Sequence, residues 1–306
     1  MMDITFWGVR GGIPSPGAHT VKYGGNTSCV ELYFPDSHRL IIIDAGSGIR
    51  NLGSRMVSPD YRQTPIDADL FFTHTHSDHI IGFPFFAPLY IPGTKLRIYG
   101  PVTYDEDSLE KIISSHMSYH FFPVRLAELA AEMVYNELKE GSYELGDGIT
   151  VTTRYLNHPL LCFGYRFEHQ GRVICTAFDN EPFRNLFARH PGKPDDDDSI
   201  ALEGENVAAQ ENTRLENFFA GADLLISDAQ YLQQEYESSR LGWGHSPVEH
   251  AIDAARRAQV KRLALFHHDP ERTDAQLDTL ESFHCKPDPK KGMEIFFARE
   301  GMRIEI

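Results

Sequence analysis

Four side chains that commonly bind metal ions stand within six residues, in the stretch T-H-T-H-S-D-H at positions 73–79. They follow the apolar run L-F-F, which predicts a buried strand. Residues i and i+2 of a strand point to the same side, so His74 and His76 can converge on one ion. The chain then turns, and Asp78 and His79 can reach a second ion beside the first. Imidazole and carboxylate groups suit zinc and its first-row neighbours.

The pattern H-x-H-x-D-H after an apolar strand resembles the signature of the metallo-β-lactamase superfamily. The resemblance covers most of the chain and implies a dinuclear-metal hydrolase. It also implies an α/β fold, an αββα sandwich of two mixed β-sheets with helices on the outer faces. The alternation of strands and helices along both halves of the sequence suits the same arrangement of layers.

The resemblance implies further ligands in later stretches, each just past an expected strand. His158, in the sequence N-H-P, is the expected third histidine of the first ion. Asp179, in F-D-N-E, is the expected bridge between two ions, which lie about 3.5–4 Å apart in two-metal sites. His267 is expected to complete the second ion because it directly follows a strand, and His268 is the alternative. Asp44, at an earlier strand end, is expected to orient a ligand by hydrogen bonding.

The candidate ligands are expected to hold two divalent ions. They divide into a first set, a second set and a bridge: His74, His76 and His158; Asp78, His79 and His267; and Asp179. Zinc is the expected metal for a histidine-rich site, while mixed histidine and carboxylate ligation also admits manganese or iron.

Two other stretches resemble paired motifs of RNase Z and related phosphodiesterases. The sequence G-H-S-P at 244–247 is similar to their G-H-S-T, with Pro247 in place of threonine. The sequence S-D-A-Q at 227–230 stands in place of their acidic H-E-A-T motif. The resemblance implies a catalytic His245 paired with Asp228; the alternative for His245 is a surface histidine beside a helix. The sequences W-G-V-R-G, Y-G-G-N-T-S-C and F-P-F-F-A-P-L-Y also resemble proteins related to class II cyclic-nucleotide phosphodiesterases.

The leading hypothesis is a metal-dependent phosphodiesterase that acts on a small phosphodiester such as a cyclic nucleotide. Two cations lower the pKa of bound water from 15.7 towards about 7. The resulting metal-bridging hydroxide, oriented by Asp78, attacks phosphorus, and His245, steadied by Asp228, protonates the leaving oxygen. Two alternatives use the same fold: a lactone, thioester or β-lactam hydrolase, and a tRNA 3′-processing nuclease.

The net charge of −15 bears on the partner. Proteins that bind a nucleic-acid backbone usually present a basic face, so this charge disfavours polymeric nucleic acid. The sequence also lacks a long insertion rich in Gly, Lys and Arg that could bind tRNA. We therefore expect a small anionic phosphodiester, which bound metal ions would attract even to an acidic protein. Exposed aromatic segments are compatible with a homodimer.

The length of 306 residues fits a single domain over 1–306, with an acidic, mobile surface insertion at about 182–211. No apolar run approaches the roughly 18 residues of a membrane span. The opening M-M-D-I-T-F predicts a strand and not a signal peptide. Four scattered cysteines without C-x-x-C suit a reducing compartment. We therefore expect a cytoplasmic protein that does not contact membranes.

The periodicity of apolar residues predicts the remaining elements. The last two strands, 293–297 and 302–306, are expected to pair as a hairpin, and Ser246 is expected to cap a helix. Thr273 is expected to cap the last helix. Other strands are expected over 4–9, 29–34, 40–43, 70–73, 96–99, 134–138, 149–155, 162–167, 172–176, 222–227 and 261–266. Other helices are expected over 47–56 and 105–119.

Overall fold

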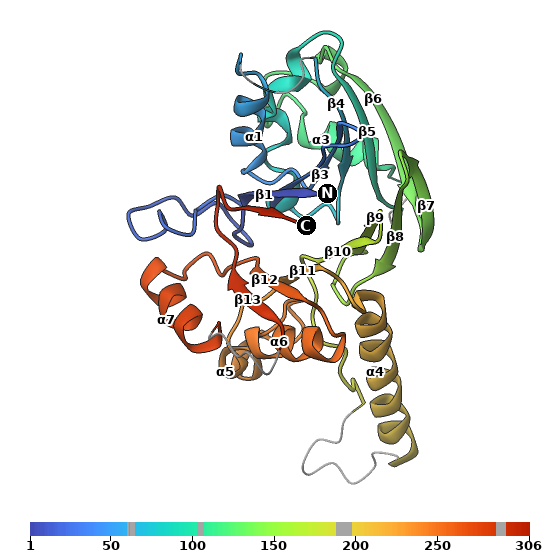
Figure 1. Ribbon diagram of the computed structural model, residues 1–306, viewed down its shortest axis with the longest axis vertical. Helices are drawn as coiled ribbons and strands as arrows, with labels where there is room; N and C mark the ends of the chain where they lie inside the picture. The colour runs from blue at the N-terminus through green and yellow to red at the C-terminus, as the bar shows by residue number, and fades with distance from the viewer. Residues whose placement is uncertain (60, 62–64, 103–106, 188–197, 286–291) are drawn as a thin grey trace.

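Two β-sheets packed face to face form the body of the molecule (Figure 1). The structure is a computed structural model that describes residues 1–306 except 60, 62–64, 103–106, 188–197 and 286–291. Within these described residues each sheet has seven strands, and helices lie on the outer faces. The predicted αββα sandwich of mixed sheets is confirmed.

The first sheet has the order β14-β1-β2-β3-β4-β5-β6. From β14 to β3 neighbouring strands run antiparallel, and from β3 to β6 they run parallel. The strands of this sheet are β1 (Asp3–Gly8), β2 (Cys29–Phe34), β3 (Arg39–Ile43), β4 (Asp67–Phe71), β5 (Lys95–Pro101), β6 (Glu132–Leu138) and β14 (Arg303–Glu305).

The second sheet repeats this plan in the order β13-β12-β11-β10-β9-β8-β7. Strands β7 to β10 run antiparallel and β10 to β13 run parallel. Each sheet thus carries a set of parallel strands whose carboxyl ends can share one edge. The strands are β7 (Gly141–Gly146), β8 (Ile149–Tyr155), β9 (Phe163–His169), β10 (Arg172–Ala177), β11 (Leu224–Asp228), β12 (Arg262–Phe266) and β13 (Glu294–Phe297).

The space between the sheets is filled by aromatic and branched side chains. Phe6 on β1 lies 6.1 Å from Phe266 on β12, measured between ring centroids. Phe71 on β4 lies 5.4 Å from Phe167 on β9. All four rings are fully buried. Alternate residues of a strand point to one face, so these positions bury one face of each sheet against the other.

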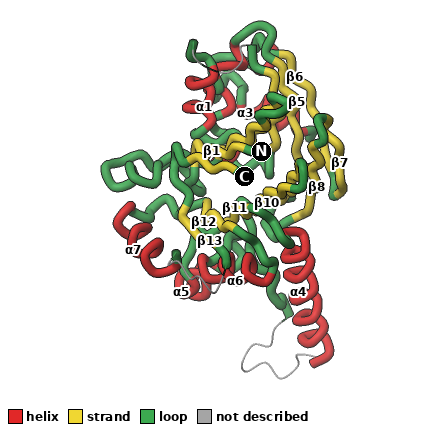
Figure 2. The backbone as a smooth tube through the Cα atoms, viewed as in Figure 1, coloured by secondary structure: helices red, strands yellow, loops and turns green. Residues whose placement is uncertain are grey.

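Helices cover the two outer faces (Figure 2). Helices α1 and α3 lie on the first sheet, whereas α6 and α7 lie on the second. Helix α4 projects from the body (Figure 1). No helix among the described residues is long and apolar enough to cross a membrane. The helices are α1 (Ile49–Met56), α2 (Ser77–Ile80), α3 (Leu109–His116), α4 (Asp198–Phe219), α5 (Gln233–Glu235), α6 (Val248–Arg257) and α7 (Asp274–His284).

The predicted C-terminal hairpin is wrong, because β13 and β14 belong to different sheets. β13 pairs with β12 and β14 pairs with β1. The connection between them crosses from one sheet to the other: the Ala298 N–H donates to Leu265, and the Gly301 N–H donates to Phe6. Each strand therefore completes the edge of an existing sheet, which satisfies more backbone groups than an isolated pair would.

Most of the region expected as a mobile insertion is helical where the structure describes it. Helix α4 begins at residue 198, and its sequence is rich in Ala, Leu, Glu and Gln, which favour helices. Ala208, Leu215 and Phe219 are 8%, 5% and 4% exposed and anchor the helix to the body. Residues 188–197, including three of the four consecutive aspartates, lie outside the described residues.

Candidate metal centre

The candidate ligands all follow strands and meet where the two sheets present their strand ends. His74 and His76 follow β4, His158 follows β8, Asp179 follows β10 and His267 follows β12. Loops at the carboxyl ends of strands are the usual place for ligands in open α/β sheets. The sequence signal was local to each loop, and the fold brings the loops into one cluster.

Three imidazoles and one carboxylate form the first group, whose nearest nitrogen and oxygen atoms lie within 4.8 Å of one another. The Nε2 atoms of His74 and His158 lie 2.9 and 3.0 Å from Nδ1 of His76. Oδ2 of Asp179 lies 3.7 Å from His74 Nε2. His76 is exposed, so this group faces solvent on one side, while His74 and Asp179 are buried.

The second group consists of Asp78, His79 and His267. Nε2 of His267 lies 3.2 Å from Oδ2 of Asp78, and Nε2 of His79 lies 3.3 Å from the same oxygen. Oδ1 of Asp179 lies 3.0 Å from His79 Nε2 and 3.3 Å from His267 Nε2. Asp179 therefore directs one oxygen to each group, which is the position expected of a bridge.

The donor set fits divalent cations better than it fits internal hydrogen bonding. His79 Nε2 and Asp179 Oδ1 are buried and lie 3.0 Å apart, but among the described residues neither atom makes a hydrogen bond of good geometry. Buried polar atoms in proteins are normally paired, so such an orphaned pair calls for an additional partner. Convergent imidazole nitrogens and carboxylate oxygens are the ligands that zinc and similar divalent metals take.

The first group of histidines is electrostatically prepared to bind metal. Burial lowers the pKa of His74 well below its usual value and lowers that of His158 to about 4. Burial also lowers the pKa of His76. The three rings are therefore neutral near pH 7, and only a neutral imidazole offers a lone pair to a metal.

Asp44 holds His79 in place from behind. Its Oδ2 accepts a hydrogen bond of 2.7 Å from Nδ1 of His79. Thr73 donates to both Asp44 oxygens, from its N–H at 2.7 Å and its hydroxyl at 2.8 Å. The proton on Nδ1 leaves Nε2 of His79 free to face the cluster. Asp44 adopts φ 60°, a strained conformation for a non-glycine residue and a recurrent feature of functional sites.

His267, not His268, reaches the metal groups. His267 has φ 59°, which turns its ring into the cluster. His268 is also buried, but its Nε2 donates a 2.8 Å hydrogen bond to the Ala298 carbonyl on the other side of the loop. A Cβ atom on Gly11 would lie 2.4 Å from the His267 ring, so only glycine leaves room for this ligand.

The half-buried His245 and the buried Asp228 form a pair beside the cluster. Nδ1 of His245 donates to Oδ2 of Asp228 at 2.8 Å and lies 3.8 Å from Oδ2 of Asp179. Burial lowers the pKa of His245, but the carboxylate of Asp228 outweighs it and raises this pKa to about 9. The N–H groups of Asn180 and Gln230 also bind Asp228, each at 3.1 Å. The imidazole is thus held as a cation next to the candidate ligands.

Glu181 organises the loop that carries His245, a role that no sequence pattern predicted. The residue is 4% exposed. Its carboxylate accepts hydrogen bonds from the Tyr236 hydroxyl and the Gly242 N–H, both at 2.8 Å, and from the Gly244 N–H at 2.9 Å. These donors follow Glu181 by 55 to 63 positions in the chain, so only the fold reveals the contact.

The same loop also orients a candidate ligand. Nδ1 of His158 donates to the Gly244 carbonyl at 3.0 Å, which turns Nε2 towards the cluster. Gly244 has φ +85°, and a Cβ there would lie 2.4 Å from His158 Nδ1. The prediction that Ser246 caps α6 is wrong: its hydroxyl donates to the Asn180 carbonyl instead. Ser246 therefore ties the loop to the strand end that bears Asp179.

Comparisons with known proteins show which family this chain is similar to in sequence and fold. The beta-lactamase superfamily domain matches residues 39–190. Ribonuclease Z of Thermococcus kodakarensis is 28% identical, covering 87% of this chain and 84% of the relative. Ribonuclease Z of Lactococcus lactis is also 28% identical, covering 87% and 88%. The crystal structure of the short form of human tRNase Z shares the fold with a TM-score of 0.61 and 21% identity, covering 99% of each chain.

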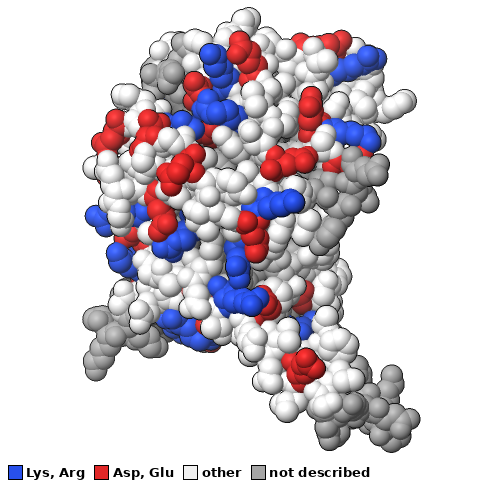
Figure 3. Space-filling view, turned by 90° about the vertical axis from the view of Figure 1, so that its right-hand side faces the viewer, with Lys and Arg blue, Asp and Glu red and all other residues white. Residues whose placement is uncertain are grey.

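These relatives correct one prediction. The expectation that polymeric nucleic acid is disfavoured as a partner is wrong, because the relatives matched over most of the chain are ribonucleases. Net charge is a sum over the whole chain, whereas a substrate meets the local field near the site. On the face seen in Figure 3, acidic and basic side chains are interspersed, so the total of −15 does not describe that surface.

Proposed function

Since the chain belongs to the metallo-β-lactamase superfamily of metal-dependent hydrolases and resembles its RNase Z branch, we propose that this centre hydrolyses phosphodiesters. The observation that carries the proposal is the His245–Asp228 pair, which holds a cationic imidazole 3.8 Å from Asp179. Phosphodiester hydrolysis develops charge on a leaving oxygen, and a positioned cationic acid can neutralise it. A thioester expels a thiolate, which leaves without protonation, so thioester hydrolysis has less need of this pair.

We propose two divalent ions for the centre, with zinc as the default and manganese or iron as alternatives. The candidate ligand sets are those named from the sequence: His74, His76 and His158; Asp78, His79 and His267; and Asp179. When bound, such ions supply a hydroxide nucleophile at neutral pH and offset charge on the phosphoryl oxygens. The protein's part is to hold these donors in place.

Three side chains take the other roles. Asp78, whose Oδ2 also accepts a 2.7 Å hydrogen bond from the Gly12 N–H, orients the attacking water through its carboxylate. His245 donates its Nε2 proton to the leaving oxygen, because Nδ1 is already engaged by Asp228. Asp228 stabilises the imidazolium before this transfer and fixes the orientation of the ring.

An RNA phosphodiester, such as the 3′ end of a tRNA precursor, is the first candidate substrate. The support is that relatives aligned over 87% of the chain are named ribonuclease Z. A small phosphodiester such as a cyclic nucleotide is the second candidate. It is favoured by a cavity of about 250 Å³ beside His158, which has room for one ring or one phosphate. A cytoplasmic location, where both substrates occur, stays a prediction.

The proposal is tested with protein reconstituted separately with zinc and with manganese. Three substrates are offered: bis(p-nitrophenyl) phosphate, 3′,5′-cyclic AMP followed by phosphorus NMR, and a tRNA precursor with a 3′ trailer resolved on a gel. We expect turnover of the synthetic diester and of at least one natural substrate. The loss in His245→Ala should be large for the natural substrate, whose alkoxide leaving group needs a proton, and small for the synthetic diester, whose p-nitrophenolate does not. Turnover of lactones or thioesters alone, unchanged in His245→Ala, would contradict the proposal.

A further inference from the structure

A small cavity adjoins the metal centre on the side of His158. It measures about 250 Å³, and its wall includes His158, Gly242 and the segment that follows Asp179. Nε2 of His158 lies 3.0 Å from His76 Nδ1 in the first ligand group. One imidazole therefore separates the cavity from the cluster, and Gly242 belongs to the loop that carries His245.

The outer wall of the cavity is fixed in position by helix α4. The side chain of Asn212 on α4 accepts from the Phe183 N–H at 3.0 Å and donates to the Phe183 carbonyl at 2.8 Å. The side chain of Asn185 donates to the Ala201 carbonyl at 2.7 Å. A Cβ on Gly204 would lie 2.2 Å from the Asn185 oxygen, so this close approach requires glycine. The wall is therefore preorganised and would not need ordering when a ligand binds.

The side chain of Arg184 lies in this wall, and its guanidinium has hydrogen-bond donors without acceptors among the described residues. Its Nε lies 3.7 Å from an oxygen of Glu181, beyond hydrogen-bond distance. Both Glu181 oxygens already accept shorter hydrogen bonds from Tyr236, Gly242 and Gly244. In the part of the chain that the structure describes, the guanidinium donates no hydrogen bond. Its planar N–H groups match the oxygens of a phosphate.

The remaining lining is apolar and suits a ring. Pro159, Phe183 and Leu186 lie along the cavity with Arg184. The volume is below the roughly 300–1,000 Å³ of pockets that enclose a whole ligand. The cavity therefore accommodates one part of a substrate whose reacting group lies at the metal centre.

We propose that this cavity is a subsite for the nucleotide that flanks the scissile phosphate. Arg184 binds the second phosphate, and Phe183 and Pro159 contact the ring. Arg184 is thus a specificity residue for substrates with more than one phosphate. This inference rests on the proposed phosphodiesterase function, and it assigns a substrate class with a nucleotide beyond the bond that is cleaved.

The kinetic test uses two chromogenic substrates that differ in one phosphate. Both are p-nitrophenyl esters of thymidine 5′-phosphate, and one also carries a 3′-phosphate. We expect the wild-type protein to show a KM lower by about tenfold to a hundredfold for the second substrate, as a charge-assisted contact allows. In Arg184→Ala the two KM values become equal within about twofold, while kcat for the simple ester is unchanged.

Two variants provide controls. Arg214→Ala removes an arginine of helix α4, the helix that supports the cavity wall. Arg214 pairs with Glu211 and does not line the cavity, so the preference for the second substrate should persist. Arg184→Lys keeps the charge without the planar fork and should retain part of the preference. Equal loss of preference in Arg214→Ala and Arg184→Ala, or a wild-type protein with no preference, overturns the subsite.

Binding separates failure of the subsite from failure of the proposed function. Calorimetry compares thymidine 3′,5′-bisphosphate with thymidine 5′-phosphate on metal-loaded protein. Tighter binding of the bisphosphate, abolished in Arg184→Ala, supports the subsite even if neither chromogenic ester is hydrolysed. Equal binding of both ligands by the wild-type protein overturns the subsite even if phosphodiesters are hydrolysed.

Discussion

Asp69 and Asp179 are both buried, with exposed fractions of 0% and 1%, yet their surroundings differ in kind. Asp69 on β4 accepts from Nε of Arg39 and from Nε of Arg97, each at 2.5 Å. Asp179 is surrounded by histidines, and one of its oxygens lacks a hydrogen-bond partner among the described residues. The first carboxylate is paired with arginines, which stay charged, whereas the second is paired with histidines, whose nitrogens can release a proton and bind a metal ion instead.

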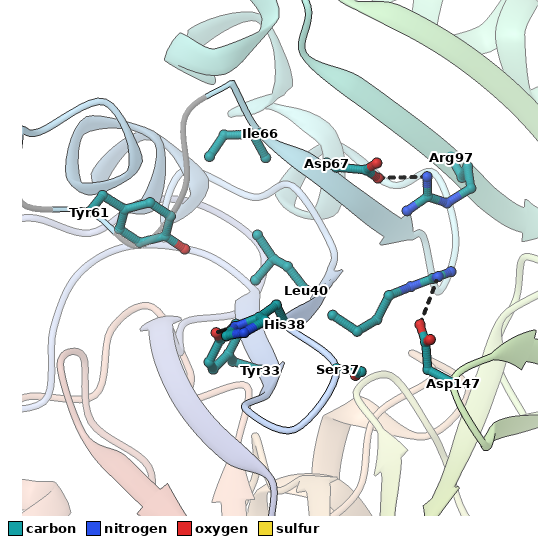
Figure 4. A pocket seen from close by; sticks show the side chains of 10 residues that line it. Tyr33, Ser37, His38, Leu40, Tyr61, Ile66, Asp67, Arg97 and Asp147 are labelled. Atoms are coloured by element: carbon teal, nitrogen blue, oxygen red, sulfur yellow. Dashed lines mark hydrogen bonds and ion pairs between the residues drawn. The ribbon is translucent and has the colours of Figure 1, made fainter.

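The arginines around Asp69 also line the larger cavity shown in Figure 4. It measures about 550 Å³ and lies beside the amino-terminal ends of β3 and β4, away from the metal centre. Arg97 additionally binds Asp67 at 2.7 Å, and Arg39 lies 3.5 Å from Asp147 (Figure 4). These carboxylates pair with the two arginines. The larger cavity therefore offers a ligand less unpaired positive charge than the smaller cavity beside His158 does.

The difference teaches how to separate a structural charge cluster from a functional one. Burial and proximity are common to both. A structural cluster closes its hydrogen bonds within the chain, because unpaired buried charge is costly. The cluster at Asp179 leaves His79 Nε2 and Asp179 Oδ1 without a hydrogen bond of good geometry and directs several further ligand atoms to one place. An additional partner bound there would complete the contacts of these atoms.

The largest contrast is expected from removing the negative charge at the metal centre. Asp179→Asn should lose bound metal and lower kcat on bis(p-nitrophenyl) phosphate by at least about a thousandfold, since metal ions contribute several kcal/mol to the transition state. Metal content is measured by mass spectrometry of dialysed protein. Asp69→Asn is the matched control and should retain full metal content. An Asp179→Asn protein with normal metal and normal activity would contradict the assignment.

Asp69→Asn should instead reduce stability. Breaking a buried ion pair leaves uncompensated charge, which costs about 3–5 kcal/mol. We expect about 3 kcal/mol, because the Arg39 and Arg97 side chains are 18% and 29% exposed and solvent offsets part of the loss. Urea unfolding measures the change. Asp67→Asn, at a 47% exposed carboxylate, should cost less than about 1 kcal/mol. Equal losses of unfolding free energy in Asp69→Asn and Asp67→Asn would contradict a special role for the buried pair.

Removing the proposed general acid should affect chemistry without affecting metal content. His245→Ala should lower kcat by about a hundredfold, at the lower end of what general acid catalysis contributes. Asp228→Asn should have a smaller effect in the same direction, since the imidazole remains but loses its anionic partner. Metal analysis and kinetics are run on the same samples. Loss of metal in His245→Ala would assign this histidine to the ligand set instead.

The smallest effect is expected at Glu181, a buried carboxylate with satisfied hydrogen bonds inside the site. Glu181→Gln replaces one acceptor oxygen with an NH₂ group, which then opposes the N–H donor of either Gly242 or Gly244, because these two bind different oxygens. The displaced loop should lower kcat by about tenfold, as for other residues that support a site. A shift in the pH profile of kcat would accompany it, because the loop positions His245. An unchanged pH profile with reduced stability would indicate a purely structural role.

The sequence predicted the parts of the site that lie in local motifs. The spacing of His74 to His79 indicated a ligand cluster, and the family resemblance supplied the candidates His158, Asp179 and His267, which the fold brings together. Glu181 escaped prediction because its hydrogen-bond donors lie in a distant segment, and Arg184 escaped it because the cavity that it lines forms only in the folded chain. Single acidic and basic residues after a strand carry no sequence pattern of their own.

The predicted secondary structure was less accurate at the edges of the fold than near its centre. Strand β7 was missed because it is half-exposed and begins and ends with glycine, which weakens the strand signal. Helix α4 was taken for a mobile segment because acidic composition was weighted above helix propensity and above the anchors Leu215 and Phe219. Strands β2 and β8 matched their predicted bounds, since β2 is mostly buried and β8 alternates buried and half-buried residues with the period of a strand.

The pairing of β14 with β1 has a consequence for synthesis. Asp3 pairs with Glu305, so one edge of β1 stays open until the chain has been extended by about three hundred residues. During translation, that edge exposes backbone groups able to pair with other nascent chains. Contacts between such remote residues also close slowly. The candidate ligand His267 and strand β14, which pairs with β1, are both synthesised late. The first sheet and the candidate metal centre can therefore form completely only after the second half of the chain has been made.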